Sequence, residues 1–172
     1  MSKISLAELN HASREQFVAA CGPFFEHSPW IAERTWERRP FGSLAELHEK
    51  LVETAQLATE TQQVNLIAAH PDLVGRLARE GRLTQESTSE QASAGLIGLS
   101  ATDAAQFDTY NQAYRDKFHF PFVICARENK KAAILAAFPA RLNNSRDAEI
   151  HTALAEIGKI ARLRLLDALT ET

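Results

Sequence analysis

The sequence is poor in the residues that build disulfide scaffolds, thiolate metal sites and membrane spans. Its 172 residues include only two cysteines, Cys21 and Cys125, which do not form a CxxC pair. This pattern excludes a disulfide framework and favours a reducing compartment. Residues 1–10 contain no apolar signal core, and no apolar run approaches the roughly 18 residues that a membrane span needs. We therefore predict a cytoplasmic protein that does not enter a membrane.

An excess of basic charge is also lacking. The formal net charge is −3, so the chain has no overall basic footprint for nucleic acid, and we predict no nucleic-acid partner. Hydrophobic residues make up 45% of the sequence and charged residues 24%, which is typical of a globular protein. A chain of this length suits one domain that buries roughly 70% of its unfolded surface. We predict a single domain over residues 1–172.

The scarcity of turn-forming and β-branched residues indicates the fold class. There are 7 glycines, 6 prolines, 5 valines and 9 isoleucines, against 28 alanines and 19 leucines. Alanine and leucine are good helix formers, whereas β-branched residues favour strands. The composition therefore predicts an all-α, single compact domain of about eight to ten helices with no β-sheet.

Capping patterns place several helix starts. Ser-x-x-Glu or Ser-x-x-Gln patterns predict helices that begin after Ser13, Ser43 and Ser87. Residues 118–125 form a short apolar run broken by a proline, which suggests a buried extended segment. Helical spacing and breakers predict further helices at residues 5–10, 28–38, 61–70, 72–80, 102–118, 129–139 (capped by Asn129 and bent or ended by Pro139) and 146–169.

His70 lies just before Pro71, at the end of a predicted helix. A residue before proline is pushed out of the helical region, which restricts the backbone there. One interpretation is that His70 only caps carbonyls of the preceding helix. The other is that Pro71 fixes the backbone so that the imidazole projects into a pocket. Histidine is the side chain best suited to exchange protons near neutral pH, so His70 is a candidate catalytic residue.

The segment Ser87-Thr88-Ser89-Glu90-Gln91 also allows two interpretations. Ser87 with Glu90 is a plain capping box, which would be purely structural. A helix N-terminus at this place would also offer N–H groups to an anionic ligand. Glu90 and Gln91 would then add acceptors and donors that suit a ureido or imidazole ligand.

Arg164 continues an apolar stripe on the last predicted helix. Ile150, Leu154, Ile157 and Ala161 form this stripe, whereas Arg162 falls on a different face. An arginine in such a position must pair with another group or extend to water at the helix end. The functional alternative is an anion clamp, because guanidinium binds carboxylates through two hydrogen bonds.

Signals for other chemistry are weak. The remaining histidines are scattered and form no HExxH or HxH pattern, so we predict no metal site and expect most of them at the surface. There is no glycine-rich phosphate loop and no GxSxG motif. Cys125 lies within an apolar run, which favours a core position over a nucleophile.

Four motifs occur in order along the chain: His70-Pro71-Asp72-Leu73, residues 87–96 (STSEQASAGL), residues 117–127 (KFHFPFVICAR) and residues 161–165 (ARLRL). Together they resemble one family, the OHCU decarboxylases. This enzyme, 2-oxo-4-hydroxy-4-carboxy-5-ureidoimidazoline (OHCU) decarboxylase, belongs to urate degradation. The resemblance covers the chain from about Leu6 to Leu169. Two positions depart from the family pattern, because His119 replaces a usual glycine whose backbone geometry histidine finds costly, and Pro139 interrupts a usually continuous helix.

The resemblance implies an all-α, homodimeric enzyme that needs no cofactor and converts OHCU to (S)-allantoin and carbon dioxide. It implies that His70 is the main catalytic residue and that Glu90 and Arg164 are its polar partners. It further implies a substrate site lined by Pro71, Ser87, Thr88, Ser89, Glu90, Gln91, Phe122, Val123, Ile124, Cys125 and Ala126.

Two other functions stay open at this point. One is a helical binding or scaffold module without chemistry, in which His70, Glu90 and Arg164 would be solvated and far apart. The other is a hydrolase of a ureido compound on the same fold, which would release ammonia or open a ring without releasing carbon dioxide.

Overall fold

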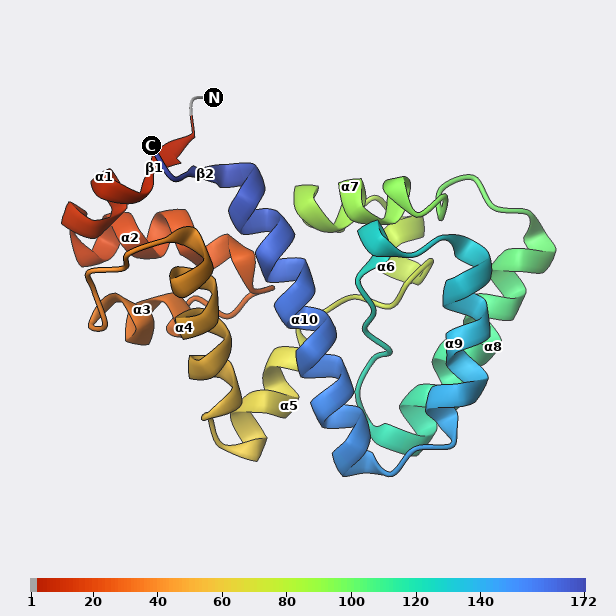
Figure 1. Cartoon of the computed structure of the whole chain (residues 1–172). Coiled ribbons are helices and arrows are strands. Elements are labelled where there is room, and N and C mark those ends of the chain that lie inside the picture. The colour runs from red at the N-terminus through yellow and green to blue at the C-terminus, as the bar shows by residue number, and fades with distance from the viewer. Residues whose placement is uncertain (1–2) are drawn as a thin grey trace. The chain divides into compact units, whose positions relative to one another are not determined.

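The computed structural model describes residues 3–172, and helices dominate it (Figure 1). This confirms the predicted all-α class, and a strand pair of two residues each is too short to change it. Within residues 3–172, no helix combines the length and the apolar content that a membrane crossing requires. The elements are β1 (Ile4–Ser5), α1 (Leu6–His11), α2 (Arg14–Cys21), η1 (Gly22–Phe24), α3 (Trp30–Trp36), α4 (Leu44–Gln56), α5 (Glu60–Ala68), α6 (Arg76–Arg79), α7 (Gln85–Ser93), α8 (Ala101–Phe118), η2 (Ala126–Glu128), α9 (Lys131–Leu142), α10 (Arg146–Ala168) and β2 (Leu169–Thr170), with η denoting 3₁₀ helices.

Capping side chains fix two of the predicted helix starts. The Ser13 hydroxyl accepts a hydrogen bond from the Gln16 N–H, and the Gln16 side chain accepts one from the Ser13 N–H. This capping box begins α2 as predicted. Ser43 accepts the Glu46 N–H in the same way and begins α4. Both predictions are confirmed.

The predicted helix start at Ser87 is wrong. Thr84 is the N-cap of α7, and its hydroxyl accepts the Ser87 N–H at 3.2 Å. Threonine caps nearly as well as serine, and a start at Gln85 adds backbone hydrogen bonds that a later start would lose. Ser87 and Glu90 therefore lie inside α7, so the capping-box interpretation of this pair is also wrong.

Two predictions about later helices also need correction. Residues 72–80 do not form one helix, because a turn over residues 72–75 delays the start of α6 until Arg76. α9 begins after Lys130, since the Asn129 side chain donates to the Cys125 carbonyl instead of capping the helix. α9 does not end at Pro139 but continues to Leu142. The other predicted helices lie at or near their expected positions.

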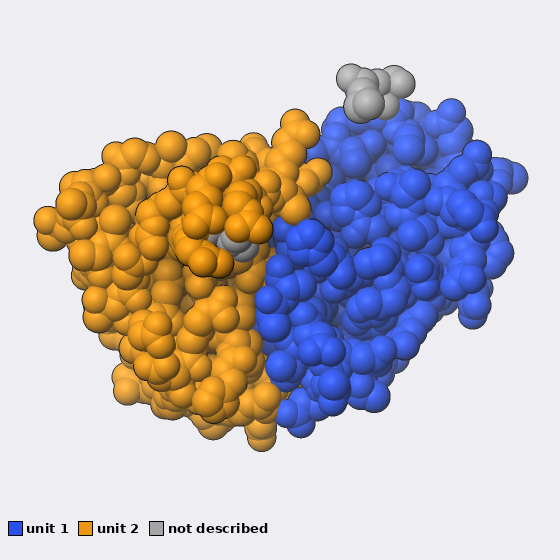
Figure 2. Space-filling view, turned by 180° about the vertical axis from the view of Figure 1, so that it is seen from behind, with its two compact units in different colours: residues 1–69, 158–172 blue, residues 70–157 orange. Residues whose placement is uncertain are grey.

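The contacts of the chain divide it into two compact units (Figure 2). Unit 1 contains residues 3–69 and 158–172, and unit 2 contains residues 70–157. α10 contributes its first part to unit 2 and its last part to unit 1. Unit 1 is thus assembled from both ends of the described chain.

Unit 1 is a small helical core. α3 packs against α2 and α4, and the strands β1 and β2 pair in parallel, with Ile4 opposite Leu169. The buried side chains of this core are mainly aromatic and aliphatic. They include Phe17, Phe24, Phe25, Ile31, Leu47 and Leu51.

Unit 2 has an aromatic core around Tyr114 of α8. The Tyr114 ring lies 5.3 Å from the Phe122 ring, and the Phe122 ring stacks on Phe138 of α9 at 3.8 Å between centroids. Phe118 and Phe120 complete the cluster. The buried Phe138 explains why α9 continues past Pro139, since this packing holds the last turn in place. The predicted extended segment before residue 126 therefore belongs to the core of unit 2.

Candidate active site

His70 is the first residue of unit 2 and is only 6% exposed. It follows the C-cap of α5, Ala69, by one residue, so the predicted position near a helix end is confirmed. Pro71 beside it is half-buried. The residues that follow restrain the backbone next to this buried histidine.

The four residues after Pro71 form a tight turn. The Gly75 N–H donates to the Asp72 carbonyl at 3.2 Å, and Val74 adopts a left-handed conformation with φ 56°. A Cβ atom at Gly75 would lie 2.7 Å from the Cβ of Asp72, so only glycine fits there. Val74 is β-branched, and such residues in the left-handed region are strained by about 1–3 kcal/mol. The surrounding structure must therefore hold this turn.

Three side chains of unit 2 hold it. The Arg115 Nε donates to both carboxylate oxygens of Asp72 at 3.0 Å. Asn111, one helical turn earlier on α8, donates its Nδ2 to the carbonyl of Leu73 at 2.9 Å. Gln91 of α7 accepts the Val74 N–H at 3.0 Å through its Oε1. The last bond connects the segment after His70 to the helix that carries Glu90.

α7 presents part of the predicted site inward. Ser87, Glu90 and Gln91 are buried, as expected for positions three and four apart on one helix face. Thr88 and Ser89, which the resemblance placed at the substrate, are exposed, and the Thr88 hydroxyl donates to the Thr84 carbonyl. The inward side of α7 is therefore made by Ser87, Glu90 and Gln91.

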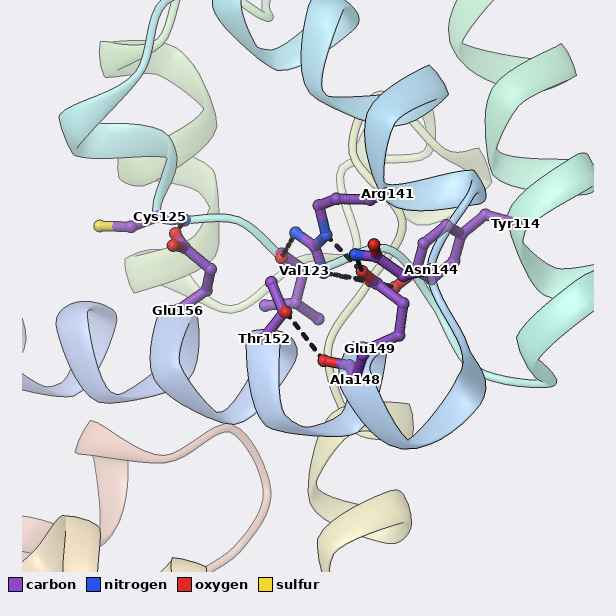
Figure 3. Close-up of polar contacts among 9 residues, drawn as sticks. All are labelled: Tyr114, Val123, Cys125, Arg141, Asn144, Ala148, Glu149, Thr152 and Glu156. Atoms are coloured by element: carbon purple, nitrogen blue, oxygen red, sulfur yellow. Dashed lines mark hydrogen bonds and ion pairs between the residues drawn. The ribbon is translucent and has the colours of Figure 1, made fainter.

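The segment from Phe122 to Ala126 is held in place through its backbone (Figure 3). Arg141 donates from Nη1 to the Val123 carbonyl at 2.6 Å, and Glu156 accepts the Cys125 N–H at 2.8 Å. Phe122, Val123, Cys125 and Ala126 are buried, and Ile124 is half-buried. η2, which begins at Ala126, packs against α7.

A buried ionic network around Arg141 holds the arginine that binds the Val123 carbonyl of this segment. Figure 3 shows Arg141 of α9 and Glu149 of α10 pointing toward each other, and the Arg141 Nε donates to Glu149 at 2.9 Å. Asn144 donates to the second carboxylate oxygen at 2.7 Å, and the Tyr114 hydroxyl donates to Glu149 as well. Burial, assisted by the hydrogen bond to Glu149, raises the pKa of Tyr114, so its hydroxyl stays protonated and donates.

Cys125 is a core residue, as predicted. It is 1% exposed, and burial raises the pKa of its thiol to about 11. The charges of Glu128, Glu156 and Glu90 act in the same direction, which indicates that Glu90 lies within electrostatic range of Cys125. A thiol of this kind stays protonated at neutral pH and is a poor nucleophile.

Arg164 belongs to unit 1 and points inward, as its stripe predicts. It is 6% exposed, and the four stripe residues before it are also buried. Its Nη1 donates to the Glu26 carboxylate and to the Pro23 carbonyl, each at 3.0 Å. The alternative of a side chain extending to water is therefore wrong. Arg162 is exposed, also as predicted.

The structure brings together one part of the predicted site. Within unit 2, the turn after His70, the inward side of α7 and the segment 122–126 are joined by hydrogen bonds and packing. Arg164 lies in the other unit, and its predicted place in a pocket with His70 and Glu90 stays a prediction.

Four buried polar residues that make structural contacts were not singled out from the sequence. They are Glu26, Asn111, Arg141 and Glu149. Three of them had a signal in the sequence: Glu26 follows Phe24-Phe25, Asn111 lies between Phe107 and Tyr114 on one helix face, and Glu149 lies four residues before Ala153.

The other histidines of the described chain do not form a metal-binding cluster. Among residues 3–172, no group of three acidic, histidine or cysteine side chains is arranged to hold a metal ion. His119 is exposed and adopts φ 64° at the C-cap of α8. This is the left-handed geometry that glycine adopts without strain, and here histidine adopts it in place of the family's usual glycine.

Comparisons with known proteins agree on one family. Residues 10–166 match the OHCU decarboxylase family. The chain is 42% identical over 165 residues to a 2-oxo-4-hydroxy-4-carboxy-5-ureidoimidazoline decarboxylase of Halalkalicoccus jeotgali, covering 96% of this chain and 92% of that protein. A crystal structure of (S)-allantoin synthase superposes with a TM-score of 0.77 at 24% identity, over 96% of this chain and 54% of that chain. A crystal structure of OHCU decarboxylase in the presence of (S)-allantoin gives 0.69 at 24% identity, over 91% of this chain and 97% of that chain. At these identities the two structures show a shared fold.

Proposed function

Because the chain belongs to the OHCU decarboxylase family, we propose that it is a carboxy-lyase that converts OHCU to (S)-allantoin and carbon dioxide in urate degradation. We propose that residues 1–172 act as one domain, without a cofactor or metal. The observation that carries the proposal is that His70 and Glu90 are both buried in unit 2, on two segments joined by the hydrogen bond between Gln91 and Val74.

The substrate itself supplies the electron sink for this reaction. Its C4 carries a hydroxyl and a carboxylate, and the neighbouring C5 is an imine carbon. When the bond from C4 to the carboxylate breaks, its electron pair forms a C4=C5 double bond, and the C5=N pair takes up a proton at nitrogen. The C4 hydroxyl then loses its proton while C5 gains one, which gives the C4 carbonyl and the stereocentre of allantoin. One proton is taken up from solvent for each carbon dioxide released.

His70 is the general base in this scheme. It removes the proton of the C4 hydroxyl, a contribution of typically about 10²–10⁴-fold. Its burial supports this role, because limited space around the ring and a restricted backbone reduce its freedom relative to a bound substrate. Pro71 contributes to that restriction.

Glu90 and its neighbours on α7 bind the polar part of the substrate. The Glu90 carboxylate accepts the ureido N–H groups or orients the His70 ring. Since the Oε1 of Gln91 already accepts the Val74 N–H, Gln91 offers its Nε2 to the substrate. Ser87 and the segment Phe122–Ala126 complete the substrate site, whereas Thr88 and Ser89 lie on the exposed side of α7.

Arg164 holds an anionic group of the substrate through its planar guanidinium. A grip that favoured the starting carboxylate would oppose its loss, so Arg164 must bind the enolate-like state at least as strongly. The Glu26 carboxylate and the Pro23 carbonyl orient the guanidinium. We further propose a cytoplasmic homodimer with no nucleic-acid or membrane partner.

The decisive test supplies the purified protein with freshly generated OHCU and follows carbon dioxide and the optical activity of the allantoin formed. Spontaneous decay gives racemic allantoin, so an enantiomeric excess of the (S) form reports the enzyme. Racemic product at the uncatalysed rate would favour a scaffold module. Release of ammonia without carbon dioxide would favour a ureido hydrolase.

A further inference from the structure

The peptide bond between Leu73 and Val74 has both of its polar groups bound by amide side chains. Its carbonyl accepts from the Asn111 Nδ2 at 2.9 Å, and its N–H donates to the Gln91 Oε1 at 3.0 Å. The Asn111 amide on α8 binds the carbonyl end of the peptide, and the Gln91 amide on α7 binds the N–H end. We propose that Asn111, acting with Gln91, is a positioning residue that locks this peptide and thereby fixes His70; the inference rests on the proposed function of His70.

The conformation of Val74 is the first reason for a lock. In a four-residue turn with a left-handed third residue, glycine or asparagine is preferred at that position. Here a valine with φ 56° occupies it. Rotation of the Leu73–Val74 peptide toward the common type I turn would return Val74 to a negative φ. The same rotation would reverse the carbonyl and the N–H and break both amide hydrogen bonds, so the two side chains oppose it.

The burial of Asn111 is the second reason. It is 6% exposed, and its Oδ1 is a buried atom with no hydrogen-bond partner among residues 3–172. An unsatisfied buried acceptor is costly, so asparagine lowers stability at this position unless its other polar group makes a compensating contact. The compensating contact is the hydrogen bond that the Asn111 Nδ2 donates to the Leu73 carbonyl.

The lock, meaning the two hydrogen bonds of Asn111 and Gln91 to the Leu73–Val74 peptide, acts on the segments that carry both proposed catalytic groups of unit 2. His70 lies three residues before Leu73, and the intervening Asp72 is held by Arg115, which is on the same face of α8 as Asn111. Gln91 is the neighbour of Glu90 on α7. One peptide bond therefore connects the backbone of His70 with the helix of Glu90, and its orientation sets their relative placement.

The test uses Asn111→Leu, Val74→Gly and the double variant, with kcat, KM and the NMR resonances of the His70 ring as readouts. Asn111→Leu keeps the branched skeleton of the side chain but replaces the amide atoms with methyl groups, so the Leu73 carbonyl loses its donor. We expect kcat to fall about tenfold with KM nearly unchanged, since misplacement of a catalytic group by about 1 Å can cost about 10²-fold. The His70 resonance should move toward that of an exposed histidine.

Val74→Gly provides the rescue, because glycine adopts the left-handed conformation without strain. In that background Asn111→Leu should lower kcat by no more than about threefold, and the His70 resonance should stay near its position in Val74→Gly, a non-additivity expected of coupled sites. Phe107→Leu is the matched control: it loosens the same face of α8 and should lower the melting temperature without changing kcat.

Equal losses of kcat in both backgrounds, or an unchanged His70 resonance in Asn111→Leu, would overturn the lock. The resonance can be read without turnover. If the wild-type protein does not convert OHCU while the resonance responds as described, the proposed function fails and the positioning of His70 by Asn111 stands.

Discussion

Each unit of the protein contains a buried arginine–glutamate pair, and the two pairs differ in what they hold. In unit 2, Arg141 and Glu149 are joined by Tyr114 and Asn144, and the guanidinium also donates to the carbonyl of Val123. In unit 1, Arg164 pairs with Glu26 and with the carbonyl of Pro23 at the middle of η1.

The comparison teaches that burial and pairing do not identify a catalytic arginine. Both arginines are less than 10% exposed and both meet a carboxylate at about 3 Å. Arg141 supports a segment of the proposed substrate site from behind, whereas Arg164 is proposed to touch the substrate because its motif matches the family. Mutations should therefore separate the two, with stability affected in one unit and catalysis in the other.

The largest effect should come from His70→Ala, which removes the proposed base of unit 2. We expect the (S) enantiomeric excess to disappear, while the melting temperature stays close to that of the wild type. The measurement is chiral analysis of allantoin formed from fresh OHCU. His151→Ala, at an exposed histidine of α10, is the control and should keep full activity. Retention of (S)-allantoin production by His70→Ala would remove His70 from the site.

Arg141→Met should give the largest loss of stability. It leaves Glu149, which is fully buried, without its cation, and breaking a buried pair in this way costs about 3–5 kcal/mol of unfolding free energy. Urea denaturation measures the loss. The double variant Arg141→Met with Glu149→Leu should recover most of it, because the buried charge is gone. A double variant as unstable as the single one would show that the Val123 contact, and not the ion pair, dominates.

Glu90→Gln should lower kcat/KM by about 10²-fold, a loss of roughly 2.7 kcal/mol in transition-state stabilisation, at an unchanged melting temperature. Glutamine keeps the shape of Glu90 and removes only its charge. Glu86→Gln, on the exposed side of the same helix, is the matched control. An active Glu90→Gln enzyme would return Glu90 to a structural role in unit 2.

Arg164→Lys should reduce kcat/KM by about tenfold, because lysine keeps the charge but loses the planar pair of donors. Arg162→Lys, two residues earlier and exposed, should be nearly silent. Steady-state kinetics on both variants makes the comparison. Equal activities would contradict the proposed clamp and would give Arg164 a structural role like that of Arg141.

The smallest effect concerns the cysteines, one in each unit. Burial raises the pKa of Cys21 to about 12 and that of Cys125 to about 11. At pH 8 at most about one Cys125 thiol in 10³ is then ionised, so alkylation of the folded protein should be very slow at both positions. Mass spectrometry after iodoacetamide treatment, with and without urea, checks this. Rapid labelling of Cys125 alone would indicate that segment 122–126 opens in solution.

Much of the fold follows from the sequence, because composition, capping residues and helical spacing act locally. The same reasoning that identified Arg164, a polar residue on an apolar stripe, would also have found Asn111 and Glu149. The start of α7 was misplaced because Thr84 and Ser87 are nearly equivalent caps. The left-handed Val74 could not be predicted, since a β-branched residue argues against that conformation and tertiary hydrogen bonds with Gln91, Asn111 and Arg115 hold the turn.

The parallel pairing of β1 with β2 brings two segments from opposite ends of the described chain side by side. Ile4 lies opposite Leu169 and Ser5 opposite Thr170, so segments near the two ends of the described chain are neighbours in unit 1. A few linker residues, at roughly 3.3 Å each, could join them without stretching either strand. The chain can then be opened elsewhere, for example in the exposed stretch near Gly98, and the order of its segments permuted while the contacts of each unit stay the same.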